Sequence, residues 1–316
     1  MKSDKIINFG ELLKKAWQFV WKFKYLWLLG ILTGGGASAS TNNLSYLINS
    51  SPNTDDWQNS MSGHNLANNI PPIEKVLGAS DTALTAAIII TISITIIIIS
   101  LLIIYLNVTA RGAIISAVNG IDRDKNFRLT ESWHYGHKYF WKIFGFSIIF
   151  SLLIILPMIF LAAPVAIMVA VRWYVPAIII GVLFLLIFVI YIIYLSLAIE
   201  YGERILVLEN KGAWESITLG TQFLNKNWKN VLLTYLILIA VMIGAGTVLA
   251  VGILLVGGIL FAMVFGLYFI NQVTAIIVAI PLGLALFVVL LAANGIISSY
   301  RSTIITLAYK EIKSIN

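Results

Sequence analysis

Residues 230–300 read NVLLTYLILIAVMIGAGTVLAVGILLVGGILFAMVFGLYFINQVTAIIVAIPLGLALFVVLLAANGIISSY, a run of 71 residues without Asp, Glu, Lys or Arg. As a single helix the run would be about 105 Å long, more than three times the roughly 30 Å hydrocarbon core of a bilayer. It therefore predicts two membrane-spanning helices joined by a turn, which we expect around Gly266 to Gln272.

Four shorter uncharged runs precede this one, and each has room for one spanning helix. A chain inside lipid must satisfy its own backbone hydrogen bonds, which favours helices. Because 59% of the 316 residues are hydrophobic and only 11% are charged, a water-soluble domain is excluded. We therefore predict an all-α, polytopic integral membrane protein that forms a single membrane domain over residues 1–316. Its six spans are expected near residues 23–40, 83–107, 144–170, 175–198, 230–258 and 273–297.

Lysine and arginine are distributed unevenly among the segments between these spans. Nineteen of the 21 lie in segments 1–24, 111–142, 200–229 and 301–316. Only Lys75 and Arg172 lie on the opposite side. Because basic residues gather on the cytoplasmic side, we predict a protein of the cytoplasmic (plasma) membrane with both termini inside and an outer loop over residues 41–81. The net charge of +7 favours anionic lipid head groups as partners and requires no nucleic acid.

The first predicted span has an alternative interpretation as a signal peptide. The apolar run Leu26 to Leu32 is followed by the small residues Gly34 to Ser40, which resemble a cleavage site. The 24 residues ahead of this run are long for a signal peptide and have an amphipathic pattern, so we favour a span that packs closely on a neighbouring helix.

Aromatic and basic residues form an amphipathic stretch ahead of the first, third and fifth spans. The stretches cover Glu11 to Trp27, Glu131 to Phe146 and Glu215 to Lys229. Trp and Lys are typical of the head-group level of a membrane, so we predict three interfacial amphipathic helices on the cytoplasmic side. The stretches also support the hypothesis of a three-fold repeat of interfacial helix, outward span and returning span. The alternative is the aromatic belt that any polytopic protein shows.

A resemblance to a known family begins at Glu203. From there to Lys229 an apolar run is followed by Glu209, Gly212 and a helix that ends in Asn227-Trp228. This pattern resembles the signature region of bacterial six-span membrane families typified by the membrane domain of glycerophosphoryl diester phosphodiesterases. The resemblance implies a membrane module that occurs alone or fused to a soluble catalytic barrel. Such a barrel needs about 250 residues, and no segment outside the spans exceeds 41 residues, so we expect no enzyme activity.

We therefore predict a non-catalytic membrane module that binds lipid or scaffolds a membrane partner, without a cofactor. The expected partners are membrane lipids with anionic head groups on the cytoplasmic side; a protein partner or a second copy of the chain is the other candidate. The residues expected at the lipid-facing interface are Trp17, Trp21, Lys22, Trp141, Lys142, Glu209, Gly212, Trp214, Trp228 and Lys229.

Two other functions stay open. A transporter or channel for a small solute would have its path between the three helical hairpins, lined by Asn107, Asn271 and Asn294. Ionisable residues within the spans, the usual markers of proton-coupled transport, are nearly missing. An intramembrane enzyme would use a metal bound by Glu131, His134 and His137, which follow one another at helical spacing. Two solvated histidines on an interfacial helix explain that last pattern more simply.

Overall fold

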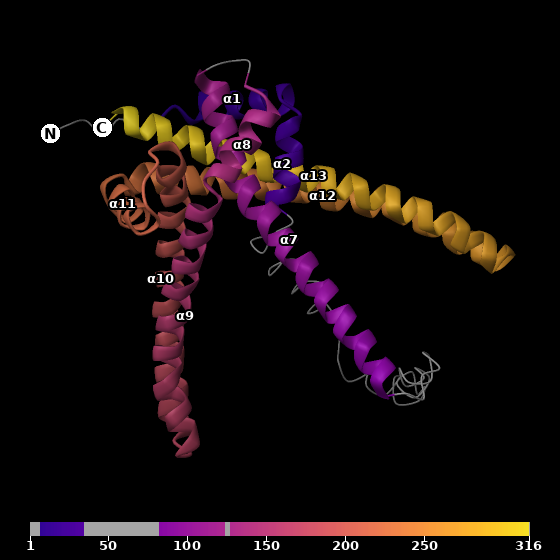
Figure 1. Cartoon of the computed structure of the whole chain (residues 1–316), viewed down its shortest axis with the longest axis horizontal. Helices are drawn as coiled ribbons and strands as arrows, with labels where there is room; N and C mark the ends of the chain where they lie inside the picture. Colours follow the sequence, from indigo (N-terminus) through magenta and orange to yellow (C-terminus); the bar gives the residue numbers. More distant parts are fainter. Residues whose placement is uncertain (1–6, 35–81, 124–126, 316) are drawn as a thin grey trace. The chain divides into compact units, whose positions relative to one another are not determined.

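The computed structural model describes residues 7–34, 82–123 and 127–315, and every regular element among them is an α-helix (Figure 1). The nine helices of these residues are α1 (Phe9–Lys22), α2 (Tyr25–Gly34), α7 (Thr82–Arg123), α8 (Leu129–Lys138), α9 (Phe140–Ala170), α10 (Tyr174–Leu208), α11 (Ala213–Lys226), α12 (Trp228–Ile270) and α13 (Gln272–Ile315). The all-helical architecture predicted from the sequence is thus confirmed for this part of the chain.

Five of these helices, α7, α9, α10, α12 and α13, are long and apolar enough to cross a membrane. They correspond to the second to sixth predicted spans, which supports an integral multi-pass membrane protein. The first predicted span is represented by α2, which has ten residues and so covers only about 15 Å, half of a bilayer core. The rest of that predicted span and the predicted outer loop 41–81 lie outside the described residues.

The long helices extend beyond the spans that hydropathy predicted. Helix α10 continues from the predicted end at residue 198 to Leu208, and α13 continues from 297 to Ile315. Helix α12 also runs on to Ile270, so that Asn271 alone separates it from α13, inside the predicted turn. The extensions of α10 and α13 contain charged residues, and they remain helical because one face of each is buried in the protein.

The chain divides into two compact units. The smaller unit covers Gly34–Asn107 and contains the first part of α7. Within it, large apolar side chains such as Ile98 and Leu101 are exposed. A helix that is apolar all round suits a hydrocarbon environment. The larger unit contains the residues up to Thr33 and from Val108 onward.

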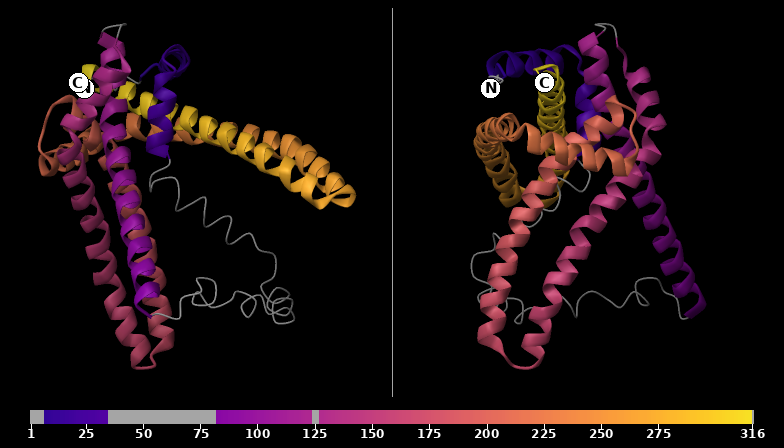
Figure 2. Two further views of the ribbon diagram at one scale, coloured as in Figure 1. Left: turned by 45° about the vertical axis from the view of Figure 1, so that its right-hand side comes forward. Right: turned by 90° about the vertical axis from the view of Figure 1, so that its left-hand side faces the viewer.

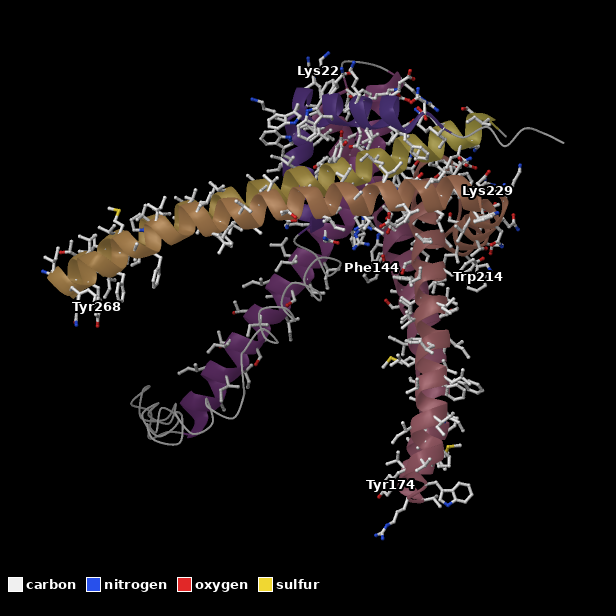
Figure 3. All side chains as sticks on the ribbon, turned by 180° about the vertical axis from the view of Figure 1, so that it is seen from behind. Lys22, Phe144, Tyr174, Trp214, Lys229 and Tyr268 are labelled. Carbon is white, nitrogen blue, oxygen red and sulfur yellow. The ribbon has the colours of Figure 1, made fainter. Side chains whose placement is uncertain are left out.

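In the larger unit the buried side chains gather at one end, which we call the hub. The hub consists of residues 7–33, 108–123, 127–146, 195–238 and 295–315. Its largest fully buried side chains are Tyr201, Phe146, Leu12, Leu26, Leu29, Ile114, Ile115, Ile143, Leu206, Ile304, Ile305 and Ile312. Away from the hub the α9–α10 and α12–α13 hairpins expose apolar side chains; Tyr174 and Tyr268 lie at their far ends (Figure 3).

Each short amphipathic helix is separated from the apolar helix that follows it by a break of one or two residues. The breaks fall at Phe23 and Lys24 between α1 and α2, at Tyr139 between α8 and α9, and at Asn227 between α11 and α12. At the last, Asn227 Nδ2 donates to the carbonyl oxygen of Phe223 at 3.1 Å. The sequence predicted continuous amphipathic stretches here. The breaks allow the short helix and the apolar helix to take different directions.

The short helices approach the long ones most closely where glycine is present. A Cβ atom on Gly220 of α11 would lie 2.4 Å from the carbonyl oxygen of Ala198 in α10. A Cβ on Gly136 of α8 would lie 2.3 Å from the carbonyl oxygen of Thr109 in α7, and one on Gly30 of α2 would lie 2.0 Å from a main-chain oxygen of α13. Small residues permit such backbone contact between membrane helices, so these glycines are required by packing.

The N-terminal helix packs against the C-terminal end of the chain. Helix α1 contacts α13, and Ala16 belongs to the same buried cluster as Ile304 and Ala308. Figure 2 shows α1 and the C-terminal end of α13 at the same end of the unit. The hub is therefore assembled from segments taken from both ends of the chain.

Candidate functional site

The tryptophans predicted for the lipid-facing interface lie on the outer surface of the hub. The exposed fractions are 50% for Trp17, 43% for Trp21, 76% for Trp141, 64% for Trp214 and 56% for Trp228. Trp17, Trp21 and Trp214 lie on the short helices α1 and α11, whose opposite faces are buried, whereas Trp141 and Trp228 lie in the first turns of α9 and α12. Lys22, Trp214 and Lys229 are labelled around the hub in Figure 3. The hub thus has a buried interior and an aromatic-basic exterior.

Three of the tryptophans near the N-terminus form one aromatic cluster. The ring centroids of Trp17 and Trp21 are 5.4 Å apart, and those of Trp21 and Trp27 are 5.1 Å apart. The Trp17 ring also meets Tyr300 of α13 edge-on at 5.6 Å, and Trp27 Nε1 donates to the carbonyl oxygen of Val20 at 2.8 Å. These contacts fix the orientation of the exposed rings on α1 and α2.

The loop between α10 and α11 is fastened to α9 by Lys142. Its Nζ donates to Asn210 Oδ1 at 2.8 Å and to the Asn210 carbonyl oxygen at 3.2 Å. Asn210 has a φ of 59°, whereas Gly212 has a φ of −72° and precedes α11. The left-handed residue of this turn is therefore Asn210, which sequence reasoning missed. Asn is among the few non-glycine residues that adopt this conformation readily.

Charged side chains connect the helices inside the hub. Arg111 of α7 lies 3.3 Å from the Glu203 carboxylate of α10. Arg204, only 5% exposed, lies 3.6 Å from the same carboxylate and donates to the carbonyl oxygen of Glu200 at 2.6 Å. Charge burial is costly unless the charges are paired. Pairing therefore explains how these arginines are accommodated next to apolar helices.

Glu200 forms a second connection. Its carboxylate accepts a hydrogen bond from Tyr235 of α12 at 2.8 Å and pairs with Arg301 of α13. No sequence pattern indicated a partner for Glu200 or Arg301. One feature of the sequence could have indicated these pairs: among the described helices, only α10 carries two acidic residues, Glu200 and Glu203, within one helical turn.

Asp122 connects the helices α1, α7 and α13. Its carboxylate pairs with Lys15 of α1 and with Lys310 of α13, while Asp122 itself lies near the end of α7. The C-terminal part of α13 thus supplies Arg301 to Glu200 and Lys310 to Asp122. It therefore takes part in the connections centred on Glu200 and on Asp122.

A cavity of about 260 Å³ lies between α10, α11 and α13, and we call it the basic pocket. It is lined by Ile205, Glu209, Leu219, Gln222, Phe223, Lys226, Asn227, Tyr309 and Lys313. Of these, only Glu209 was predicted as a site residue. The others are brought together by the packing of α13 on the α10–α11 pair, which no local sequence pattern reveals.

Glu209 is held in the basic pocket by two donors. Its carboxylate accepts hydrogen bonds from the Tyr309 hydroxyl and from Lys313 Nζ, the latter at 2.5 Å. Burial opposes ionisation of Glu209, but the hydrogen bonds from Lys313 and Tyr309 outweigh it and hold the pKa of Glu209 below its ordinary value. Glu209 is therefore an anion at neutral pH.

The asparagines predicted to line a transport path belong to different elements of the fold. Asn271 Oδ1 accepts hydrogen bonds from the backbone N–H groups of Val273 at 2.9 Å and Thr274 at 3.3 Å, so it caps the start of α13. Asn294 lies about 34 Å further along the same helix, near the hub. Asn107 belongs to the smaller unit.

The proposed metal ligands of α8 do not form a ligand set. The Glu131 carboxylate accepts a hydrogen bond from the backbone N–H of Arg128 at 3.3 Å, as part of the cap of α8. The ring of His134 packs edge-on against Tyr135. Within residues 7–34, 82–123 and 127–315 no group of three or more His, Cys, Asp or Glu side chains is placed to hold a metal ion.

Comparison with known proteins gives one result. No curated protein and no solved structure matches the chain. The family described as "Family of unknown function (DUF7544)" matches residues 17–308, a stretch that begins within α1 and ends within α13. This match provides no link with the glycerophosphoryl diester phosphodiesterases. The chain therefore belongs to the family of unknown function DUF7544.

Proposed function

We propose that this chain is a non-catalytic protein of the cytoplasmic membrane whose hub lies at the head-group level and binds anionic lipid there. The observation that carries the proposal is the exposure of four tryptophans around the hub. Trp17 and Trp214 lie on short helices whose other faces are buried, and Trp141 and Trp228 lie in the first turns of the apolar helices α9 and α12. Tryptophan has an apolar body and a polar N–H group, so it is most stable where hydrocarbon meets water.

The charge distribution supports a cytoplasmic hub. The segments that form it hold most of the 21 lysines and arginines, whereas Arg172 lies in the turn at the far end of the α9–α10 hairpin. Basic residues outside the hydrocarbon prefer the cytoplasmic side and the anionic lipids found there. The proposal therefore places both ends of the chain in the cytoplasm.

We also propose that the hub consists of three repeated units. The nine described helices follow three times the order of a short amphipathic helix, an apolar helix and a long apolar helix. Helix α8 packs on α7, α11 packs on α10, and α1 packs on α13. A Glu precedes a buried small residue by five positions in each short helix: Glu11 and Ala16, Glu131 and Gly136, Glu215 and Gly220. This order supports a membrane module of the kind that the sequence resemblance implies.

The experiment that tests lipid binding is native mass spectrometry of the full chain released from its own membrane in gentle detergent. Replacing Trp17, Trp141 and Trp228 by Ala should reduce the amount of co-purified anionic lipid. The matched control is Trp173→Ala, because Trp173 is equally exposed but lies at the far end of the α9–α10 hairpin. Equal lipid retention in the triple variant and the unmodified chain would contradict the proposal. Release of the unmodified chain without lipid would favour the transporter alternative, to be tested by flux assays in liposomes.

A further inference from the structure

The basic pocket contains cationic and polar side chains. Lys226 and Lys313 both line it, together with the amides of Gln222 and Asn227. Lys313 is paired with Glu209. Lys226 has an exposed side chain and has no ion pair or hydrogen bond with the other residues of the described segments. Two lysines and one glutamate leave the pocket with one net positive charge.

The floor of the basic pocket is apolar. Ile205 and Tyr309 are buried, and the rings of Phe223 and Tyr309 lie 5.1 Å apart. A site with ammonium groups at its mouth and hydrocarbon and aromatic groups below suits a ligand that is itself partly anionic and partly apolar. Sites for small molecules generally combine a mostly apolar lining with a few placed polar groups.

The position of the basic pocket indicates where its ligand comes from. Asn227, one of the lining residues, directly precedes Trp228, which is 56% exposed and begins the apolar helix α12. Under the proposed function, Trp228 lies at the head-group level, so the pocket opens at the same depth. Its volume of about 260 Å³ is slightly below the roughly 300 to 1,000 Å³ of sites that enclose a whole drug-sized ligand. It suits a head group better than a complete lipid.

We propose that the basic pocket binds the phosphate group of an anionic phospholipid head group, with the ammonium groups of Lys226 and Lys313 as its main partners. Gln222 also lines the pocket, one helical turn before Lys226 on α11, and its amide can donate to a phosphate oxygen. Hydrogen bonds between ammonium and phosphate are charge-assisted and about twice as strong as neutral ones. This inference rests on the proposed function for the depth of the pocket, but it adds a specific site and a ligand class.

The test is a titration of the full chain in detergent with dihexanoyl phosphatidylglycerol, followed by native mass spectrometry. Lys226→Gln should bind this lipid roughly tenfold more weakly, which corresponds to about 1.4 kcal/mol, and Lys226→Arg should restore most of the affinity. Lys14→Gln is the control, because Lys14 of α1 is also an exposed lysine and lies outside the pocket. Dihexanoylglycerol, which lacks the phosphate, should bind no better to the unmodified chain than to Lys226→Gln.

Glu209→Gln provides a second test, in which the affinity for phosphatidylglycerol is expected to rise and not to fall. Removing the carboxylate frees Lys313 and raises the positive charge of the basic pocket, so affinity for phosphatidylglycerol should increase. A residue with a purely structural role would instead lower the affinity when replaced. Unchanged affinity in Lys226→Gln, or a loss of affinity in Glu209→Gln, would overturn the inference.

Two further measurements separate the possible outcomes. If inorganic phosphate or glycerol phosphate competes with phosphatidylglycerol for the unmodified chain, the site recognises phosphate in soluble ligands as well; without competition, the lipid is the ligand. Both results support a phosphate site. If Lys226→Gln keeps its affinity while the triple tryptophan variant loses co-purified lipid, the pocket inference fails and the proposed function stands. If Lys226→Gln loses affinity while the triple variant keeps its lipid, the pocket inference stands and the proposed role of the tryptophans fails.

Discussion

Gly220 illustrates how single residues determine the packing of the hub. Its backbone approaches α10 so closely that a Cβ would lie 2.4 Å from the carbonyl oxygen of Ala198. The atom it would meet belongs to a helix backbone, which cannot rotate away as a side chain can. By contrast, Gly258 in α12 has no atom within 4 Å of the position of a Cβ. Glycines that look alike in the sequence therefore have different roles.

We predict that Gly220→Ala destabilises the protein by about 1 to 3 kcal/mol, the usual cost of overpacking. Thermal unfolding in detergent, followed by circular dichroism, measures the effect. Gly258→Ala is the control and should leave the unfolding temperature unchanged or slightly higher, because alanine favours helix more than glycine does. Equal unfolding temperatures for the two variants would show that the close contact at Gly220 is not present in the protein.

Glu209 gives a prediction of pH dependence. Its pKa is lower in the folded state than in the unfolded chain, so its carboxylate stabilises the fold fully above about pH 4.3, the ordinary value of Glu. This contribution is lost as the pH falls through the lowered folded pKa. Glu209→Gln should therefore be less stable than the unmodified chain at pH 7, and the difference should shrink below about pH 4.

The control for Glu209 is Glu215→Gln. Glu215 pairs with Lys211 at 2.6 Å, but both side chains are exposed, and exposed pairs contribute little. Its replacement should cause no measurable change between pH 3 and pH 7. A difference between Glu209→Gln and the unmodified chain that stays constant with pH would show that Glu209 acts through packing and not through its charge.

At the scale of elements, the short helix α1 is held in the hub by few polar connections. Lys15 pairs with Asp122 of α7, which also pairs with Lys310 of α13. One carboxylate therefore fixes α1 to two long helices. The side chain of Asp122 is only 16% exposed, so solvent screens these pairs less than it screens pairs on the open surface.

Asp122→Asn should loosen α1 more than the other short helices. We expect backbone amide exchange in Phe9–Lys22 to become roughly tenfold faster, because a hydrogen bond to a charged group contributes about 1.5 to 3 kcal/mol. Exchange in α11 should stay unchanged, since its contacts with α10 do not involve Asp122. Hydrogen exchange with mass spectrometry measures both segments in one experiment. Uniform acceleration across all helices would point to general destabilisation instead.

The sequence predicted the elements better than their assembly. The uncharged runs located α9, α10, α12 and α13, because hydrocarbon tolerates almost no unpaired charge and the signal is local. The pairing of Glu200 with Arg301 joins residues 101 positions apart, and the pairing depends on how α10 and α13 pack. The lining of the basic pocket has the same origin. Such contacts leave no periodic pattern in the sequence, so only Glu209 among the pocket residues was predicted.

At the scale of the whole molecule, the larger unit combines a packed hub with hairpins that expose apolar side chains. From Tyr174 to Ala198, α10 extends about 37 Å, somewhat more than the hydrocarbon thickness of a bilayer. Such a helix crosses the membrane with a tilt. In the proposed orientation the hub lies in the cytoplasm and the Trp173 end of the hairpin lies outside.

Single cysteines test this orientation directly. The chain has no cysteine, so Ser314→Cys and Trp173→Cys each carry one thiol. With a maleimide that does not cross membranes, we expect intact cells to be labelled at position 173 and not at position 314. Labelling at 314 should appear only after the membrane is permeabilised. The opposite result would place the hub outside the cell and contradict the proposed orientation.

The contact between α1 and α13 has a consequence for biosynthesis. A ribosome produces α1 well before α13, so the apolar face that contains Ala16 has no α13 to pack on until α13 has been synthesised. An interrupted chain would leave this face uncovered and Lys15 without Lys310 nearby. Apolar surface exposed in this way is prone to aggregation. The hub can therefore close only after α13 has been made, when most of residues 1–316 have already left the ribosome.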